Sequence, residues 1–215
     1  MASVHGIAAV CEAITHILKT SMTNEQAMEL GLGELSPTFA VYRTDDFEPS
    51  MQNPGAESMT SGASIFLYRV LPNLSHRTPA GRLLPDGTQQ LTQLPLDLHL
   101  LVTIWGEDAS TQNLLVGWVM RTLEDYPIIP ATILNLAANR TVFAEDEAVE
   151  LLLSEMSGEE LLQLWDTLGS ADGRYQISIP YLVRNLFIDS MRSRPLGEPV
   201  QVRTADMQAI AGGRS

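Results

Sequence analysis

The stretch that decides the fold is Leu94-Pro95-Leu96-Asp97-Leu98-His99-Leu100-Leu101-Val102-Thr103-Ile104-Trp105-Gly106. Over most of its length, the character of its side chains alternates with a period of two. Such alternation is typical of a strand, since successive side chains point to opposite faces of a sheet. One face carries only aliphatic side chains, which are Leu96, Leu98, Leu100, Val102 and Ile104. The opposite face carries Asp97, His99, Leu101, Thr103 and Trp105. We therefore predict a long strand whose aliphatic face is buried under a helix and whose second face lies toward solvent, another chain or the C-terminal tail.

The segments on either side of this strand predict further helices and strands. Apolar residues at helical spacing indicate helices over residues 3–19, 108–124 and 157–168. Gly31 and Gly33 would end a further short helix over residues 24–30. Apolar runs beside turn residues indicate strands over residues 38–43, 64–71, 148–154 and 175–188. Asp108 or Ser110 can cap the third helix, Ser157 and Glu160 match a capping box, and Gly169 is the expected C-cap of the fourth helix. Residues 130–141 show no clear pattern.

This order of elements predicts an α+β fold in which helices pack on a mainly antiparallel, twisted sheet with long loops or arms. We expect one domain over residues 1–190, followed by a tail over residues 191–215 that is flexible or ordered by a partner. The irregular stretches 44–62 and 74–93 are candidate partner-binding arms. Because proline has no N–H for a sheet ladder, Pro180 implies an edge position or a bulge in the last strand. The side chains expected on one face of that strand are Tyr175, Ile177, Ile179, Tyr181, Val183 and Phe187.

Composition narrows the classes of protein that fit. The 215 residues are 45% hydrophobic, which is enough for a sizeable core, and the net charge is −13 with Lys19 as the single lysine. Such an acidic surface repels phosphate backbones, so we expect no nucleic-acid partner. No secretory signal and no apolar run of about 20 residues is present, which predicts a cytoplasmic protein without membrane insertion. Cys11 is the single cysteine, and its apolar neighbours predict a small buried side chain.

Asp97 and His99 form the best candidate pair for catalysis, since both project to one face of the strand. A carboxylate can orient an imidazole as a general base, so a small soluble hydrolase is one hypothesis. The sequence nominates no nucleophile for that pair, and the histidines lack the spacing of a metal site. We therefore expect neither a catalytic residue, nor a cofactor, nor a metal, and favour a solvated or intersubunit sheet face.

Three blocks of sequence resemble a known family. The first block is Ile65-Phe66-Leu67-Tyr68-Arg69-Val70-Leu71-Pro72-Asn73, followed by His76-Arg77. The second block is Leu94 to Thr103, followed by the predicted helix that contains Leu115-Val116-Gly117. The third block is Ser157-Gly158-Glu159-Glu160-Leu161 with Leu164-Trp165, followed by Ser178-Ile179-Pro180-Tyr181. In this order they resemble the tail-terminator, or cap, proteins of phage-tail-like contractile injection systems of the extracellular, virulence-cassette and antifeeding-prophage kind. The resemblance spans residues 3–189. Pro180 and Val102 depart from the family pattern.

The resemblance implies a structural protein rather than an enzyme. Terminators of this kind form a six-fold ring that ends the inner tube and anchors the last sheath layer, so the implied partners are further copies of the chain, the sheath protein and the inner tube protein. A second alternative to this role is an adaptor that recruits a partner through the C-terminal tail. The candidate interface residues are Tyr68, Arg69, Asn73, Arg77, Asp97, His99, Arg192 and Arg194.

Overall fold

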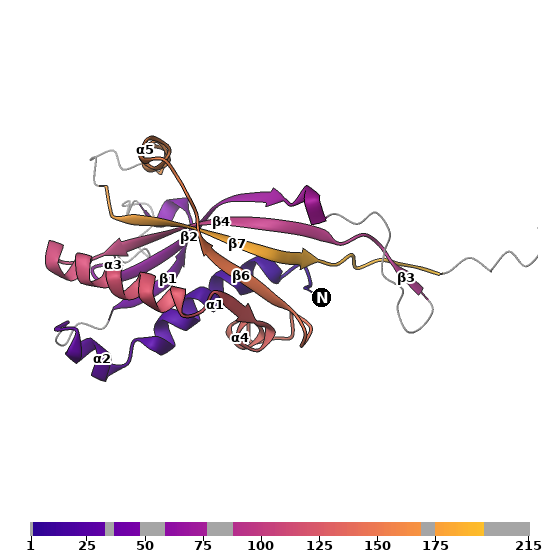
Figure 1. Cartoon of the computed structure of the whole chain (residues 1–215), viewed down its shortest axis with the longest axis horizontal. Coiled ribbons are helices and arrows are strands. Elements are labelled where there is room, and N and C mark those ends of the chain that lie inside the picture. The colour runs from indigo at the N-terminus through magenta and orange to yellow at the C-terminus, as the bar shows by residue number, and fades with distance from the viewer. Residues whose placement is uncertain (1, 33–36, 48–58, 77–87, 169–174, 196–215) are drawn as a thin grey trace, which may run out of the picture.

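The computed structural model describes residues 2–32, 37–47, 59–76, 88–168 and 175–195 and has an α+β fold, as predicted. Its main sheet has six strands in the order β1-β2-β4-β7-β6-β5 (Figure 1). The strands are β1 (Thr38–Tyr42), β2 (Gly62–Pro72), β4 (Leu94–Trp105), β5 (Ile128–Pro130), β6 (Ala148–Leu153) and β7 (Ser178–Ile188). The helices are α1 (Gly6–Ser21), α2 (Asn24–Glu29), α3 (Ala109–Glu124), α4 (Ala131–Ala137) and α5 (Gly158–Thr167). Two short 3-10 helices are η1 (Thr44–Asp46) and η2 (Leu74–His76).

Strand β4 is the centre of the sheet, as its length and alternation predict. It pairs antiparallel with β2 along one side and with β7 along the other. Strand β6 is antiparallel to β7, and β5 to β6. The exception to the antiparallel prediction is β1, which runs parallel to β2.

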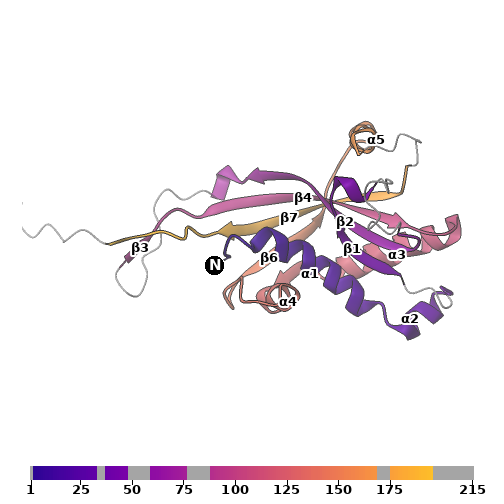
Figure 2. The ribbon, with the colours of Figure 1, turned by 180° about the vertical axis from the view of Figure 1, so that it is seen from behind.

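The aliphatic face of β4 forms the core, which confirms the prediction for that face. Leu98, Leu100, Val102 and Ile104 are fully buried. Helices α1, α3 and α4 lie on this side of the sheet, and α1 contacts β1, β2, β7 and both other helices (Figures 1 and 2). Helix α1 places Cys11 in this core, as predicted, and burial raises the pKa of the Cys11 thiol to about 12.

The prediction for the second face of β4 is half wrong. Leu101 and Thr103 are fully buried there, because Trp165 of α5 packs over this part of the sheet. The Trp165 indole N–H donates to Ser178 Oγ at 3.2 Å, and the Ser178 and Thr103 hydroxyls lie 2.9 Å apart. Aromatic rings complete the cover, since Phe47 contacts Trp165 edge to face with ring centroids 5.6 Å apart. Asp97 and His99 lie on the remaining half of this face and are partly exposed.

Strand β7 departs from simple alternation at two positions. Asn185 has a positive φ of 63° beside a shift in the pairing with β4, and Leu186 is buried in place of the predicted Phe187. Pro180 is not on an edge strand, since β7 has neighbours on both sides. The Ser154 N–H donates to the Pro180 carbonyl at 3.0 Å, so the backbone of Pro180 faces β6. Because β6 ends at Leu153, the N–H that Pro180 lacks falls where the hydrogen-bond ladder between β6 and β7 ends.

Prolines also stand at the free sides of the sheet. Beyond Phe66, the described residues of β2 pair with β4 alone, and the Asn73 N–H donates to the Pro95 carbonyl. Because neighbouring residues of a strand face opposite ways in the sheet plane, Pro72 faces away from β4. On the other side, the Ala131 N–H donates to Glu147, so Pro130 at the end of edge strand β5 faces outward.

The two predicted N-terminal helix caps are confirmed. Asp108 accepts a 2.8 Å hydrogen bond from the Thr111 N–H at the start of α3. Ser157 and Glu160 form the reciprocal capping box at the start of α5. The C-cap of α5 is Leu168 rather than the expected Gly169, so that prediction is wrong by one residue. Gly169 itself, most of the stretch 44–62 and the tail beyond residue 195 lie outside the described residues.

A second, two-stranded sheet lies far from the helices. Strand β3 (Thr88–Gln90), within the stretch predicted to be irregular, pairs antiparallel with β8 (Ser193–Pro195), which follows β7. Figure 1 shows β3 beyond the far ends of β4 and β7, so the two strands form an arm that carries the chain away from the body of the domain.

Candidate functional site

The uncovered half of the second sheet face brings together most of the predicted site residues. We define this open half-face by two rows of side chains that the strand register places side by side. The row nearer to α5 contains Arg69, His99, Leu182 and Leu152, and the outer row contains Leu71, Asp97, Arg184, Glu150 and Ile128. All of these side chains are at least partly exposed. The face therefore mixes aliphatic and charged groups, as protein-binding surfaces do.

Under the edge of α5, Tyr68, Arg69 and His99 line a cleft of about 360 Å³. A shift in the β2–β4 pairing falls between Leu67 and Arg69, and it brings the Tyr68 ring to 5.9 Å from the His99 ring. Burial, then the Arg69 guanidinium, hold the pKa of His99 below its usual 6.5, although Asp97 opposes them. His99 is therefore neutral at pH 7. Burial likewise raises the pKa of Tyr68.

Asp97 and His99 do not form the pair that the hydrolase hypothesis needs. The Asp97 carboxylate accepts hydrogen bonds from Asn73 Nδ2 at 3.2 and 3.3 Å. Among the described residues no hydrogen bond joins it to His99, so Asp97 anchors the end of β2 rather than orienting an imidazole. Among the described residues, no three or more His, Cys, Asp or Glu side chains lie close enough together to hold a metal ion.

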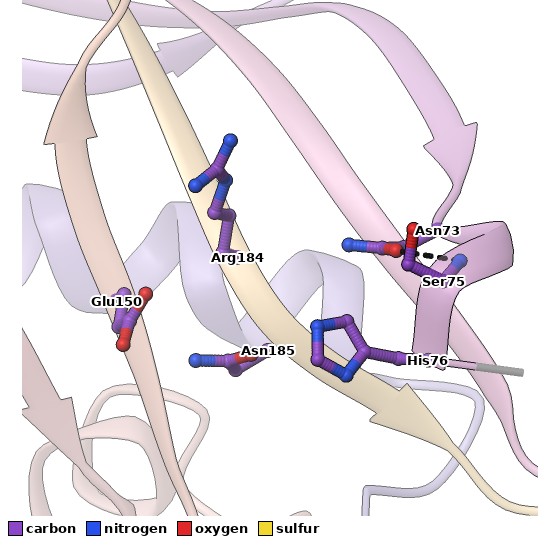
Figure 3. A pocket seen from close by; sticks show the side chains of 6 residues that line it. All are labelled: Asn73, Ser75, His76, Glu150, Arg184 and Asn185. Atoms are coloured by element: carbon purple, nitrogen blue, oxygen red, sulfur yellow. Dashed lines mark hydrogen bonds between the residues drawn. The ribbon is translucent and has the colours of Figure 1, made fainter.

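A second cleft of about 440 Å³ lies farther along the open half-face, between β6, β7 and η2. Figure 3 shows Arg184 and Asn185 of β7 between Glu150 of β6 and His76 of η2. Glu150 is the cross-strand neighbour of Arg184, but the two side chains form no ion pair. Asn185 lines this cleft at the point where its positive φ interrupts the alternation of β7.

Two arginines on the open half-face thus lack an ion-pair partner among the described residues. Among the described residues, the ion pairs between a cation and a carboxylate are those of Arg43 and Arg121, which lie outside this face. Arg69 and Arg184 are exposed and have no carboxylate within ion-pair distance. In a chain with 26 acidic and 13 basic residues, unpaired arginines indicate a place where a carboxylate from outside the chain can bind.

The predicted residues do not all belong to this face. Asn73 lies at its rim, where the Ser75 N–H donates to Asn73 Oδ1 at 3.2 Å. Arg192 is exposed beyond the end of β7. Arg194 lies opposite Gln89 in the backbone register of β3 and β8, in the distant arm. Arg77 lies outside the described residues.

Sequence reasoning missed Arg184, Leu182 and Leu152. The signal for two of them was present, because Leu182 and Arg184 alternate with the buried Tyr181 and Val183. Leu152 depends on the pairing of β6 with β7, which local alternation does not reveal.

Comparison with known proteins identifies the family. Residues 9–202 match the family described as Pvc16 N-terminal domain, and the chain belongs to it. The fold is similar to that of the sheath/tube terminator of PVC, an extracellular contractile injection system, in its extended state. The TM-score is 0.58 at 16% identity, over 97% of this chain and 65% of that one. The chain thus spans slightly less than two thirds of the length of that terminator.

A second similar structure is the tube-terminating cap of the anti-feeding prophage, with a TM-score of 0.47 and 17% identity over 67% of this chain and 49% of that one. No curated protein matches the sequence. In the described part of the chain, no helix combines the length and hydropathy needed to cross a membrane.

Proposed function

We propose that this chain is a structural terminator of a contractile injection system. It forms a ring, most simply of six copies, that ends the inner tube and anchors the last layer of sheath. The observation that carries the proposal is the family match over residues 9–202, and the likeness of fold to a sheath/tube terminator supports it. In this role the chain assembles in the cytoplasm, becomes part of the particle, and needs neither a cofactor nor a catalytic residue.

The open half-face suits such a role because a ring requires each copy to present two different surfaces to its neighbours. Its aliphatic side chains and unpaired arginines fit a protein partner rather than a small substrate. The β3–β8 arm fits contact with sheath or tube, since it projects from the body of the domain (Figure 1). We assign residues 1–190 to the ring and residues 191–215 to contacts outside it.

Removing the chain from a cell that builds the particle tests the proposal. Without a terminator, tubes and sheaths should vary in length, and images should show no ring above the last sheath layer. Restoring the full chain should restore both. Uniform lengths without the chain would refute the terminator role. A chain lacking residues 191–215 distinguishes the adaptor hypothesis, which predicts normal lengths with loss of the recruited partner.

The hydrolase hypothesis is tested with His99→Ala. An enzyme would lose turnover while particles assemble normally. A terminator has no turnover to lose, so any effect of the substitution should be on particle assembly.

A further inference from the structure

The outer face of α5 carries groups that complement the open half-face. One exposed stripe of the helix consists of Glu159, Leu162 and Asp166, which recur at helical spacing. This stripe lies away from the side of the helix that carries Leu161, Leu164 and Leu168, which are buried or half-buried. Leu162 is 55% exposed although it is a large aliphatic residue. Glu159 accepts a long 3.4 Å hydrogen bond from Gln163, and neither acid forms an ion pair with another described residue. An apolar side chain between two carboxylates therefore faces solvent.

The open half-face has the opposite arrangement. Arg69 and Arg184 stand on β2 and β7, with β4 between them, and Leu182 and the neutral His99 lie between the two guanidinium groups. Two carboxylates belong to the same face, but Asp97 is bound by Asn73 and Glu150 lies on the far side of Arg184. Glu160 of α5 also lines the Arg69 cleft. Its hydrogen bonds with Ser157 are the main cause that lowers its pKa, and Arg69 adds a smaller electrostatic attraction without forming an ion pair.

The spacings of the two sets of charges agree. Arg69 lies two strands away from Leu182, its partner in register across β4, and Arg184 is two residues farther along β7. Strand geometry therefore places the backbones of Arg69 and Arg184 about 12 Å apart. Seven residues along a helix place Glu159 and Asp166 about 10 Å apart. A helix laid on the face can thus bring each carboxylate to one arginine with its central leucine over His99 and Leu182.

We propose that α5 of one copy of this chain docks on the open half-face of the next copy, with Glu159 and Asp166 paired to Arg69 and Arg184. The two surfaces occupy different parts of the same subunit. Helix α5 stands over one half of the sheet face, where its Trp165 is buried (Figures 1 and 2). The two arginines lie on β2 and β7, in the other half of that face. The contact is therefore head to tail, which is the kind that builds a ring when the rotation closes. This inference rests on the proposed function and names the surfaces that form its ring.

Charge exchange in the full chain tests the contact. The face variant is Arg69→Glu with Arg184→Glu, and the helix variant is Glu159→Arg with Asp166→Arg. Each alone sets like charges against each other, and we expect at least tenfold weaker self-association for each by native mass spectrometry across a concentration series. Mixing the two variants restores opposite charges at every contact, provided that they alternate. The mixture should therefore assemble as equal numbers of both.

Matched controls carry the same changes of charge elsewhere. Lys19→Glu with Arg140→Glu corresponds to the face variant, and Glu25→Arg with Glu29→Arg corresponds to the helix variant, all at exposed positions. These chains should associate like the wild type.

Several results would overturn the inference: a wild-type chain that stays monomeric at high micromolar concentration, single variants that associate normally, or a mixture that stays apart. The test is independent of the terminator role. If the wild-type chain controls particle length but the variants associate normally, this contact is wrong and the proposed function stands. If the variants behave as expected but particle length does not depend on the chain, the contact stands and the proposed terminator function is wrong.

Discussion

Replacing Trp165 with alanine should detach α5 without unfolding the sheet. The side chain is 4% exposed, and burying a tryptophan removes about 150–250 Å² from water, worth roughly 4–6 kcal/mol at about 25 cal/mol per Å². This agrees with the loss of about 3–5 kcal/mol typical of large-to-small substitutions in a core. Helix α5 has 10 residues, too few for a stable isolated helix. The loss should therefore appear as local opening.

Hydrogen exchange followed by mass spectrometry measures this opening. A loss of about 3–5 kcal/mol corresponds to a factor of roughly 150–5,000 in the opening equilibrium. Amides of α5 should exchange faster by up to that factor, and amides of β4 should keep their protection, because the core on the other face is untouched.

A matched variant separates packing from hydrogen bonding. Trp165→Phe keeps an aromatic ring but removes the indole N–H that donates to Ser178, and it should cost about 1–2 kcal/mol. Ser178 Oγ keeps its contacts with Thr103 and with the Gln176 carbonyl. Equal acceleration of exchange in α5 and β4 for Trp165→Ala would show that the helix and the sheet unfold together, and would refute the reasoning.

Three further outcomes follow from single positions. Gly62→Ala should lower the melting temperature strongly and disrupt β1, since φ is +136° and an added Cβ would lie 1.8 Å from the Thr38 carbonyl oxygen; circular dichroism during heating measures this. Native Cys11 should not react with a thiol reagent at pH 8, because it is buried with a pKa of about 12, whereas the unfolded chain should react readily. The hydrogen bond from the Thr111 N–H lowers the pKa of the Asp108 carboxyl in the folded chain. The ionised carboxylate therefore stabilises the fold above the pKa that Asp108 has in the unfolded chain, and this contribution is lost as the pH falls through the lower, folded-state pKa. The free energy of unfolding, measured during acid titration, should fall less in Asp108→Asn than in the wild type.

The sequence predicts what depends on local pattern. The buried face of β4, the capping box at Ser157 and the cap at Asp108 each follow from residues close together in the chain, and all three are confirmed. Residues 130–141 gave no pattern because α4 has only seven residues, and its Ala131 and Leu134 are buried through tertiary contacts with α1.

What the sequence could not predict depends on contacts between distant residues. The burial of Thr103 requires Trp165, 62 positions later, and Phe47 from a segment that shows no periodicity. The shifts in strand pairing near Tyr68 and Asn185 likewise arise from how whole strands align, yet they decide which side chains reach the open half-face. The candidate site was therefore only partly predictable, with Arg69, Asp97 and His99 found and Arg184 missed.

The outward-facing prolines at the sheet margins have a consequence for the chain before assembly. An exposed strand edge is a template on which other chains can aggregate, and proline removes the N–H that such pairing needs. Pro72 and Pro130 interrupt the donor rows on opposite sides of the sheet. These two positions therefore disfavour edge-to-edge pairing between free copies of the chain.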